Sequence, residues 1–318
     1  MINYGKQFID SKDIFAVQKV LKSHWLTQGP LIKKFEFKLK NYFGSKYCAV
    51  VSNGTAALHL AGLALGWKKG DIVLTSPISF LASSNCILYT GATPDFVDIN
   101  QTNYNINLSK LEERIKKLKS LSRKVVAVVA TDFAGQPCNW KNLKKISLKY
   151  NLKLVNDNCH AIGAKYFKNK SYAAKYADIV THSYHPVKNI TTGEGGSILT
   201  NNKEIFDKIN ILRSHGTQKN PKKMASNDGP WYYEMQELGY NYRITDFQCA
   251  LGISQIKKLG KFLKKRKKIA NIYNEAFSNK DIFTIPKVNK MIQHAYHIYP
   301  LLINFNKLKI KKNNFFKK

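Results

Sequence analysis

Lys188 differs from most other lysines of this chain in its surroundings. It lies in the stretch SYHPVKNITTGEGG (residues 183–196), between an apolar strand predicted over residues 177–184 and a short strand predicted over residues 197–200. Burial of a lysine at the end of a strand keeps part of its amine neutral and nucleophilic, as the amine of a Schiff-base lysine must be. The same pattern also fits a loop lysine whose amine lies in water.

Asp157 follows a strand predicted over residues 152–155. Open α/β sheets bind their ligands at the carboxyl ends of parallel strands, so a carboxylate at this place is a candidate ligand contact. An aspartate that caps a helix or a turn produces the same pattern. The residue therefore has a structural and a catalytic interpretation, and both stay open at this point.

A second strand end carries a glycine-containing turn. Asn53-Gly54-Thr55 follows a strand predicted over residues 47–52 and opens a helix predicted over residues 56–65. The free N–H groups and the dipole of such a helix attract a phosphate, although strand–glycine–helix turns are common. Phe80 follows a strand predicted over residues 72–75 and is either a core ring or a ring of the site.

Together these residues match the needs of one cofactor. Pyridoxal 5'-phosphate needs an amine for its aldehyde, a carboxylate that keeps its pyridine nitrogen protonated, and N–H donors for its phosphate. Lys188 would supply the amine, Asp157 the carboxylate and Gly54 the N–H donors. The sequence therefore predicts pyridoxal 5'-phosphate as the cofactor.

Strands and helices alternate between residues 47 and 213, which predicts a mostly parallel α/β sheet covered by helices. The first helix is expected over residues 11–23, with Ser11 as a candidate cap and Ile14, Val20 and Leu21 at helical spacing. The remaining elements are strands over residues 93–97 and 125–131 and helices over residues 31–43, 80–89, 108–121, 140–150 and 203–213.

The pattern changes after residue 213. Residues 217–239 predict a long polar loop, of the kind that forms lids and binding elements, and residues 244–277 predict one long helix. Only one further strand is predicted, over residues 297–303, and a single strand forms no stable sheet. We therefore expect a large cofactor-binding domain over residues 1–257 and a small, incomplete C-terminal domain over residues 258–318.

Composition excludes several classes of protein. The chain has 318 residues, 44% of them hydrophobic, and no run of about eighteen apolar residues. Its start resembles no secretory signal, so we expect a cytoplasmic protein without a membrane partner. The five cysteines form no Cys-x-x-Cys pair, which predicts neither a disulfide framework nor a metal site.

The formal net charge of +32 comes almost entirely from lysine. Proteins that read nucleic acids depend on arginine forks and on basic residues interleaved with stacking aromatic rings. The lysines here accompany many Asn, Ile, Phe and Tyr residues, which is typical of a compositional bias. A nucleic-acid partner is therefore not expected.

Several motifs resemble those of the DegT-type sugar-nucleotide aminotransferases, in order and spacing and across essentially the whole chain. They are NGTAAL (53–58), DNCHAIG (157–163), residues 183–196, RSHG (213–216) and GYNYR (239–243). Two more, WLTQGP (25–30) and SPISF (76–80), are most similar to those of the members that act in pseudaminic acid biosynthesis. The resemblance implies a type I aminotransferase-like α/β fold.

The resemblance also implies roles for the matched residues. Lys188 would be the Schiff-base lysine and proton carrier, and Asp157 would pair with the pyridinium nitrogen. The other cofactor contacts would be Phe80 on the ring face, His160 near the ring hydroxyl, Gly54, Thr55 and Ser183 at the phosphate, and Asn241 at the phosphate of the neighbouring subunit. The substrate contacts would be Tyr4, Trp25, Leu26 and Thr27, with His185 and His215 near the substrate.

The implied substrate is a UDP-linked 4-keto-6-deoxy-N-acetyl-hexosamine, with glutamate as amino donor and a homodimer that shares its active sites. A GDP- or dTDP-linked keto-sugar and a catalytically idle relative remain as alternatives. A sugar dehydratase is disfavoured, since those relatives replace the lysine that is present here as Lys188. Relatives continue beyond this length with a nucleotide-binding loop, so we expect a complete cofactor site and an incomplete substrate site.

Overall fold

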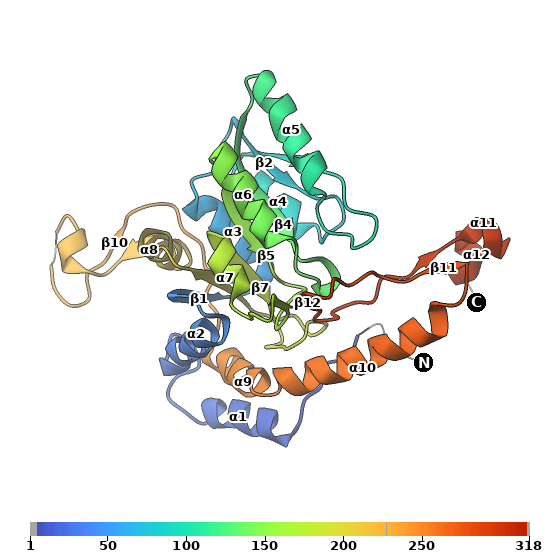
Figure 1. Cartoon of the computed structure of the whole chain (residues 1–318). Helices are drawn as coiled ribbons and strands as arrows, with labels where there is room; N and C mark the ends of the chain where they lie inside the picture. Colours follow the sequence, from blue (N-terminus) through green and yellow to red (C-terminus); the bar gives the residue numbers. More distant parts are fainter. Residues whose placement is uncertain (1–4, 227, 317–318) are drawn as a thin grey trace.

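The computed structural model describes residues 5–226 and 228–316. Its centre is a seven-stranded sheet with the order β1-β8-β7-β5-β4-β2-β3 (Figure 1). Only β8 runs antiparallel to its neighbours, so all the other strands of the sheet end at the same edge. The strands are β1 (Tyr47–Val51), β2 (Asp71–Thr75), β3 (Thr93–Phe96), β4 (Lys124–Thr131), β5 (Lys153–Asp157), β7 (Ile179–Ser183) and β8 (Gly196–Thr200).

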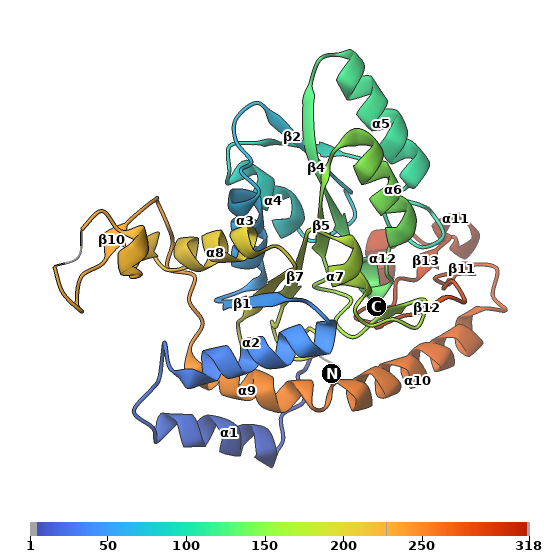
Figure 2. The ribbon, with the colours of Figure 1, turned by 60° about the vertical axis from the view of Figure 1, so that its left-hand side comes forward.

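Helices cover both faces of this sheet, as the alternating pattern predicts (Figure 2). The first apolar core lies beneath α2 (Pro30–Phe43), α5 (Leu108–Ser120), α6 (Trp140–Tyr150), α7 (Tyr172–Tyr176), α9 (Asp246–Ile256) and the start of α10 (Leu259–Phe277). The second core lies beneath α3 (Gly54–Ala64), α4 (Ala82–Leu88) and α8 (Lys203–Leu212). The mostly parallel α/β fold is thereby confirmed.

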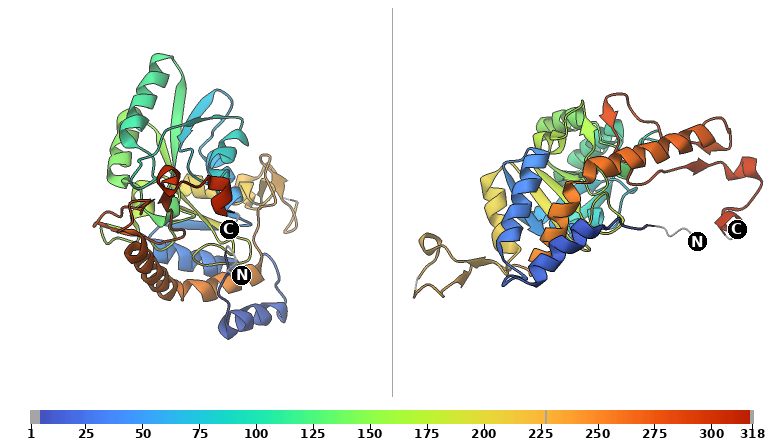
Figure 3. Two further views of the ribbon diagram at one scale, coloured as in Figure 1. Left: turned by 90° about the vertical axis from the view of Figure 1, so that its right-hand side faces the viewer. Right: turned by 90° about the horizontal axis from the view of Figure 1, so that it is seen from below.

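Shorter elements extend this centre. Helix α1 (Ser11–Leu21) packs against α9, and β9 with β10 forms a small ribbon that projects beyond α8 (Figure 1). Figure 3 shows how α10 and the chain that follows it extend away from the sheet. The remaining elements are η1 (Phe133–Gly135), β6 (Lys165–Tyr166), β9 (Thr217–Gln218), η2 (Pro221–Lys223), β10 (Glu234–Met235), β11 (Phe283–Thr284), β12 (Ile292–Gln293), β13 (Leu302–Ile303), α11 (Phe305–Leu308) and α12 (Lys312–Phe316).

The single helix predicted over residues 244–277 is wrong, because α9 and α10 are separate helices. The break falls at Lys258, whose ammonium group binds Asp10 at 2.7 Å and Asp13 at 2.5 Å. A tertiary ion pair of this kind leaves no mark in the local periodicity. The break coincides with the predicted domain boundary at residues 257 and 258, which itself stays a prediction.

The ends and faces of α1 also differ from the prediction. Its N-cap is Asp10, which forms a capping box with Asp13, rather than Ser11. Of the apolar stripe, Val20 is buried, whereas Ile14 and Leu21 are 62% and 59% exposed. Helical spacing identified an apolar face, but that face is only partly covered within this chain.

The strand predicted over residues 297–303 is also wrong. Only β13 is extended there, and it pairs with β11 rather than standing alone. The chain at His297 instead donates its N–H to the Ala134 carbonyl at 2.9 Å and so packs against η1. Just before it, β12 pairs with β6 in a separate two-stranded sheet, which joins the C-terminal segment to the chain between β5 and α7.

Two expectations from composition can be compared with the structure. All five cysteines are buried and unpaired, as the apolar contexts predict. Within residues 5–226 and 228–316, no helix is long and apolar enough to cross a membrane.

A buried carboxylate connects the ends of β4 and β5 to two helices. Asp132 is fully buried and accepts hydrogen bonds from Cys138 N at 2.7 Å and Trp140 Nε1 at 2.8 Å. It also accepts hydrogen bonds from Asn158 Nδ2 at 2.9 Å and the Tyr172 hydroxyl at 2.7 Å. Because α6 begins at Trp140 and α7 at Tyr172, one side chain fixes both helix starts against the sheet.

Replacing this carboxylate should destabilise the protein strongly. In Asp132→Ala the buried donors lose their acceptor, and each unsatisfied buried donor costs about 1–3 kcal/mol. We expect the free energy of unfolding in urea to fall by more than about 3 kcal/mol. The matched control is Asp228→Ala, at an exposed loop position, which should change it by less than about 0.5 kcal/mol. Equal stabilities of the two variants would contradict this prediction.

Candidate active site

A cavity of about 1170 Å³ lies at the edge where the parallel strands β1, β5 and β7 end. The chain segments that follow these strands form its walls, together with the start of α3 and part of the C-terminal segment. Most of the predicted cofactor residues and one predicted substrate residue lie in its lining: Gly54, Thr55, Phe80, Asp157, His160, Ser183, His185 and Lys188. The structure therefore brings together residues that are up to 134 positions apart in the sequence (Gly54 and Lys188).

The wall at the start of α3 fits a phosphate. Asn53 caps the helix, and its side-chain oxygen accepts a hydrogen bond from Ala56 N at 2.8 Å. The N–H groups of Gly54 and Thr55 belong to the first turn, where no partner exists within the helix, and the helix dipole favours an anion there. A Cβ atom on Gly54 would lie 2.7 Å from Ser183 Cβ, so only glycine lets the ends of β1 and β7 approach this closely.

The carboxylate of Asp157, the last residue of β5, is held by its neighbours. The residue is 3% exposed. Its Oδ2 accepts a hydrogen bond from Ser83 Oγ at 2.6 Å, and its Oδ1 accepts one from Cys159 N at 3.2 Å. Ser83 lies on α4, and nothing in its local sequence distinguishes it, so sequence reasoning missed it.

The amine of Lys188 meets the C-terminal segment. Its Nζ lies 3.4 Å from His297 Nε2, and the ring centroids of His297 and His160 are 4.5 Å apart. Lys188 is half-buried, so its side chain reaches both the protein interior and the cavity. His297 was predicted only as a strand residue, and its place beside Lys188 follows from the tertiary path of residues 292–297.

Both imidazoles are neutral at neutral pH. Burial and, to a smaller extent, the charge of Lys188 lower the pKa of His160 to about 4, against the opposing charge of Asp157. Burial also lowers the pKa of His297 well below its usual range, with a smaller contribution from the charge of Lys188. The Nδ1 atom of His160 is buried without a hydrogen-bond partner among the described residues, which fits a cofactor polar group beside it.

Phe80 is unusually exposed for an aromatic residue. Its side chain is 65% exposed, and it lies two residues before α4 at the cavity wall. The interpretation of Phe80 as a core ring is therefore wrong. An exposed ring beside a carboxylate and an amine offers a flat apolar surface to a planar cofactor.

The other predicted contacts lie outside this cavity lining. Trp25, Leu26 and Thr27 are exposed residues of the loop between α1 and α2, and Leu26 accepts a backbone hydrogen bond from Asp246 N at 2.9 Å. His215 and Asn241 are also exposed. Tyr4 falls outside the described residues.

Sequence reasoning also missed two tyrosines of the GYNYR motif. Tyr240 and Tyr242 line the cavity, and their rings stack at 5.0 Å. Tyr242 OH lies 3.1 Å from His59 Nδ1, which is a further lining residue. Asn241, which lies between these tyrosines, is exposed and is not among the lining residues of the cavity.

The neutral histidines make stability depend on pH. The pKa of His297 is depressed in the folded protein, so between the folded value and about 6.5 the unfolded state binds more protons. The free energy of unfolding should therefore fall as the pH is lowered from 7 to about 5. In His297→Gln this fall should be smaller. The measurement is urea unfolding at both pH values, and an identical fall in both proteins would contradict the assignment.

Comparisons with known proteins identify the family of this chain. The model of the DegT/DnrJ/EryC1/StrS aminotransferase family matches residues 7–317. A UDP-4-amino-4,6-dideoxy-N-acetyl-beta-L-altrosamine transaminase from Campylobacter jejuni is 42% identical over 303 residues, which are 95% of this chain and 77% of the relative. A GDP-perosamine synthase from Escherichia coli O157:H7 is 34% identical over 92% of this chain and 74% of its own.

Solved structures give the same result. The PseC aminotransferase of Helicobacter pylori, involved in the biosynthesis of pseudoaminic acid, superposes with a TM-score of 0.86 and 31% identity over 99% of this chain and 82% of its own. Spr1654 from Streptococcus pneumoniae in its PLP form superposes with a TM-score of 0.84 and 26% identity over 95% of this chain and 78% of its own. The chain belongs to the DegT/DnrJ/EryC1/StrS family and is a sugar-nucleotide aminotransferase that uses pyridoxal 5'-phosphate.

Proposed function

We propose that this chain transfers an amino group from glutamate to a UDP-linked 4-keto-6-deoxy-N-acetyl-hexosamine, as a step of pseudaminic acid biosynthesis. The observation that carries the reaction is the placement of the Lys188 amine and the Asp157 carboxylate in one cavity with the first turn of α3. The choice of sugar is supported by the 42% identity with the altrosamine transaminase, compared with 34% for the GDP-perosamine synthase.

The residues of the cavity have separate tasks. When bound, pyridoxal phosphate supplies an aldehyde that accepts an amino group and a ring that withdraws electrons from the reacting carbon. Gly54 and Thr55 would hold the phosphate with their N–H groups, and Phe80 would lie against one face of the ring. Asp157 would accept a hydrogen bond from the ring N–H, and the hydrogen bond that it accepts from Ser83 fixes the direction of its carboxylate.

Lys188 would provide the amine that binds the aldehyde, and its Nζ would be the base that carries the proton of the amino transfer. His297 lies 3.4 Å from this atom. Because burial keeps His297 neutral, its Nε2 can accept an N–H from the amine and hold Nζ in place without repelling it.

The test is a panel of keto-sugars, with UDP-, GDP- and dTDP-linked forms and glutamate as donor, read by mass spectrometry of the product. The UDP-linked N-acetyl sugar should be aminated fastest. Lys188→Ala should lose turnover by about a factor of 10³ or more, because the general base and nucleophile are removed together. Lys175→Ala changes an exposed lysine and should leave turnover unchanged.

Three outcomes would contradict parts of this proposal. Faster amination of the GDP-linked sugar would favour a perosamine-type activity over the UDP sugar. Substantial turnover by Lys188→Ala without added amine would remove the assigned role of Lys188. Absence of a borohydride-sensitive visible absorption band after incubation with pyridoxal phosphate would indicate a catalytically idle relative.

We further propose that the active enzyme is a cytoplasmic homodimer with shared active sites. Asn241 is exposed, whereas Tyr240 and Tyr242 on either side of it line the cavity. This placement supports a contact between Asn241 and the cofactor phosphate of a second copy. The segment that contains β9 and β10 also exposes apolar side chains, namely Trp231, Met235 and Leu238. An interface would bury this apolar surface.

Complementation between two inactive variants tests the shared site. Lys188→Ala and Asn241→Ala should each have little activity. In an equal mixture about half of the dimers are mixed, and each mixed dimer keeps one intact site of two, so about a quarter of wild-type activity should return. The mixture must first be unfolded and refolded together to exchange subunits, and separately refolded variants are the control. A mixture that stays inactive, although light scattering shows dimers, would contradict the shared site.

A further inference from the structure

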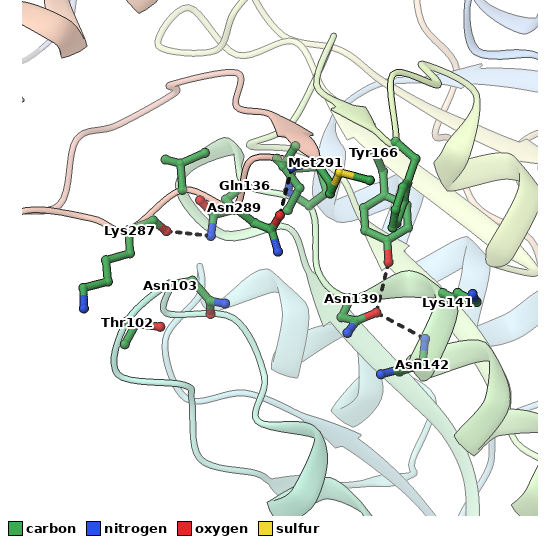
Figure 4. Close-up of a pocket in the computed structure, with 14 residues that line it drawn as sticks. Thr102, Asn103, Gln136, Asn139, Lys141, Asn142, Tyr166, Lys287, Asn289 and Met291 are labelled. Carbon is green, nitrogen blue, oxygen red and sulfur yellow. Dashed lines mark hydrogen bonds between the residues drawn. The ribbon is translucent and has the colours of Figure 1, made fainter.

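A second cavity of about 460 Å³ lies apart from the active site and shares no lining residue with it. Its walls come from the loop at residues 102–103, the start of α6, β6, and residues 287–292 of the C-terminal segment. Figure 4 shows these side chains around the open space between the segments. Because residues from four separate parts of the chain meet here, the cavity is formed only in the folded protein.

Three of the four asparagines that line this cavity already use their side-chain oxygens as hydrogen-bond acceptors. The side-chain oxygen of Asn139 accepts hydrogen bonds from the Tyr166 hydroxyl at 3.0 Å and Asn142 N at 3.3 Å. The side-chain oxygen of Asn289 accepts one from Met291 N at 2.8 Å (Figure 4). In each case the NH₂ group remains as the part of the side chain that can meet a ligand.

Asn103 follows the same rule on the opposite wall, because its side-chain oxygen accepts a hydrogen bond from Asn105 N at 3.1 Å. The cavity therefore presents amide N–H donors from the loop at residues 102–103, from the start of α6 and from the C-terminal segment. Donors that converge from three directions match the oxygens of a tetrahedral anion better than those of a planar carboxylate.

The charges of the cavity point to the same class of ligand. Lys141 on α6 and Lys287 on the C-terminal segment both line it, and no aspartate or glutamate is among its lining residues (Figure 4). The cap residue and first turn of α6 form part of the wall, and a helix of eleven residues favours an anion at this end. Two cations without a carboxylate leave an uncompensated positive charge at the site.

Gln136 indicates that the ligand also carries a hydrogen-bond donor. This lining residue is 3% exposed, and its Nε2 donates to the Lys287 carbonyl at 3.2 Å. Its Oε1 is buried and has no hydrogen-bond partner among the described residues. A buried acceptor without a partner is costly, and a hydroxyl group of a ligand would satisfy it.

We propose that this second cavity binds a small phosphate ester, with the phosphate among the side-chain amides of Asn103, Asn139 and Asn289 and with Lys141 and Lys287 at the rim. The cavity is larger than a phosphate ion and lies within the usual range of small-ligand sites. Its aromatic wall, Tyr166 and Phe167, and the Gln136 oxygen suit an organic part with hydroxyl groups. A phosphorylated sugar or polyol has this combination of charge, size and donors.

The experiment is isothermal titration of the full chain, first loaded with pyridoxal phosphate so that the first turn of α3 is already occupied. The probes are glycerol 3-phosphate, inorganic phosphate and malonate, at constant ionic strength. Glycerol 3-phosphate should bind saturably at one site, inorganic phosphate more weakly, and malonate weakest. In the double variant Lys141→Gln/Lys287→Gln, binding of glycerol 3-phosphate should weaken by about tenfold or more.

The matched control is Lys145→Gln/Lys290→Gln, which removes the same charge from exposed residues of the same two segments outside the lining. It should weaken binding by less than about threefold, because salt screens charges that lie outside the lining of the cavity. Both variants change exposed lysines, and circular dichroism would check that both are folded. Absence of saturable binding, equal losses in the two double variants, or tighter binding of malonate than of the phosphates would overturn the proposal.

Discussion

The buried carboxylate of Asp132 joins several chain segments at the edge of the sheet where the candidate active site lies. It is fully buried and accepts hydrogen bonds from Cys138, Trp140, Asn158 and Tyr172, which belong to segments that are far apart in the sequence. Burial raises the pKa of the Asp132 carboxyl, and the donors from Tyr172, Cys138 and Trp140 act in the opposite direction. A carboxylate can accept all of these bonds at once because each oxygen has two lone pairs. The position of Asn158, next to Asp157, thereby depends on a residue that does not touch the cavity.

The network continues from Asn158 in one direction across the sheet. The amide of Asn158 donates to Asp132, so its oxygen, 3.2 Å from His182 Nε2, must accept from that nitrogen. Burial lowers the pKa of His182 to about 3, so the ring is neutral and its Nδ1, 3.1 Å from Ser197 Oγ, must accept. Ser197 in turn accepts from the Tyr184 hydroxyl at 2.6 Å. This series of hydrogen bonds has only one consistent set of donors and acceptors. It fixes Tyr184, which precedes Lys188, and Ser197, which follows it.

The sequence predicted the sheet and the helices that cover it, and eight of its predicted site residues line one cavity, because each of these leaves a local pattern. Asp157 and Gly54 directly follow apolar strands, and strands of a parallel sheet end at one edge. Ser83 and His297 could not be found in this way, since their roles depend on contacts with Asp157 at 2.6 Å and Lys188 at 3.4 Å that join distant segments. The break between α9 and α10 was also missed; Lys258, which lies at this break, binds Asp10 and Asp13 from a distant part of the chain. Local pattern thus identifies which strand ends carry chemistry, and tertiary contacts decide what surrounds them.

The C-terminal segment shows how far such contacts extend. Arg266 on α10 donates to the His297 carbonyl at 3.0 Å, and Ala295 N donates to the Gly135 carbonyl at 2.8 Å. A Cβ atom on Gly135, whose φ is +104°, would lie 2.9 Å from Tyr296 N, so glycine is required where this segment crosses η1. His297 contacts Lys188 at one end of the segment, and Asn289 lines the second cavity at the other. A ligand bound by residues 287–292 would therefore act on the same backbone that positions the neutral imidazole beside the Lys188 amine.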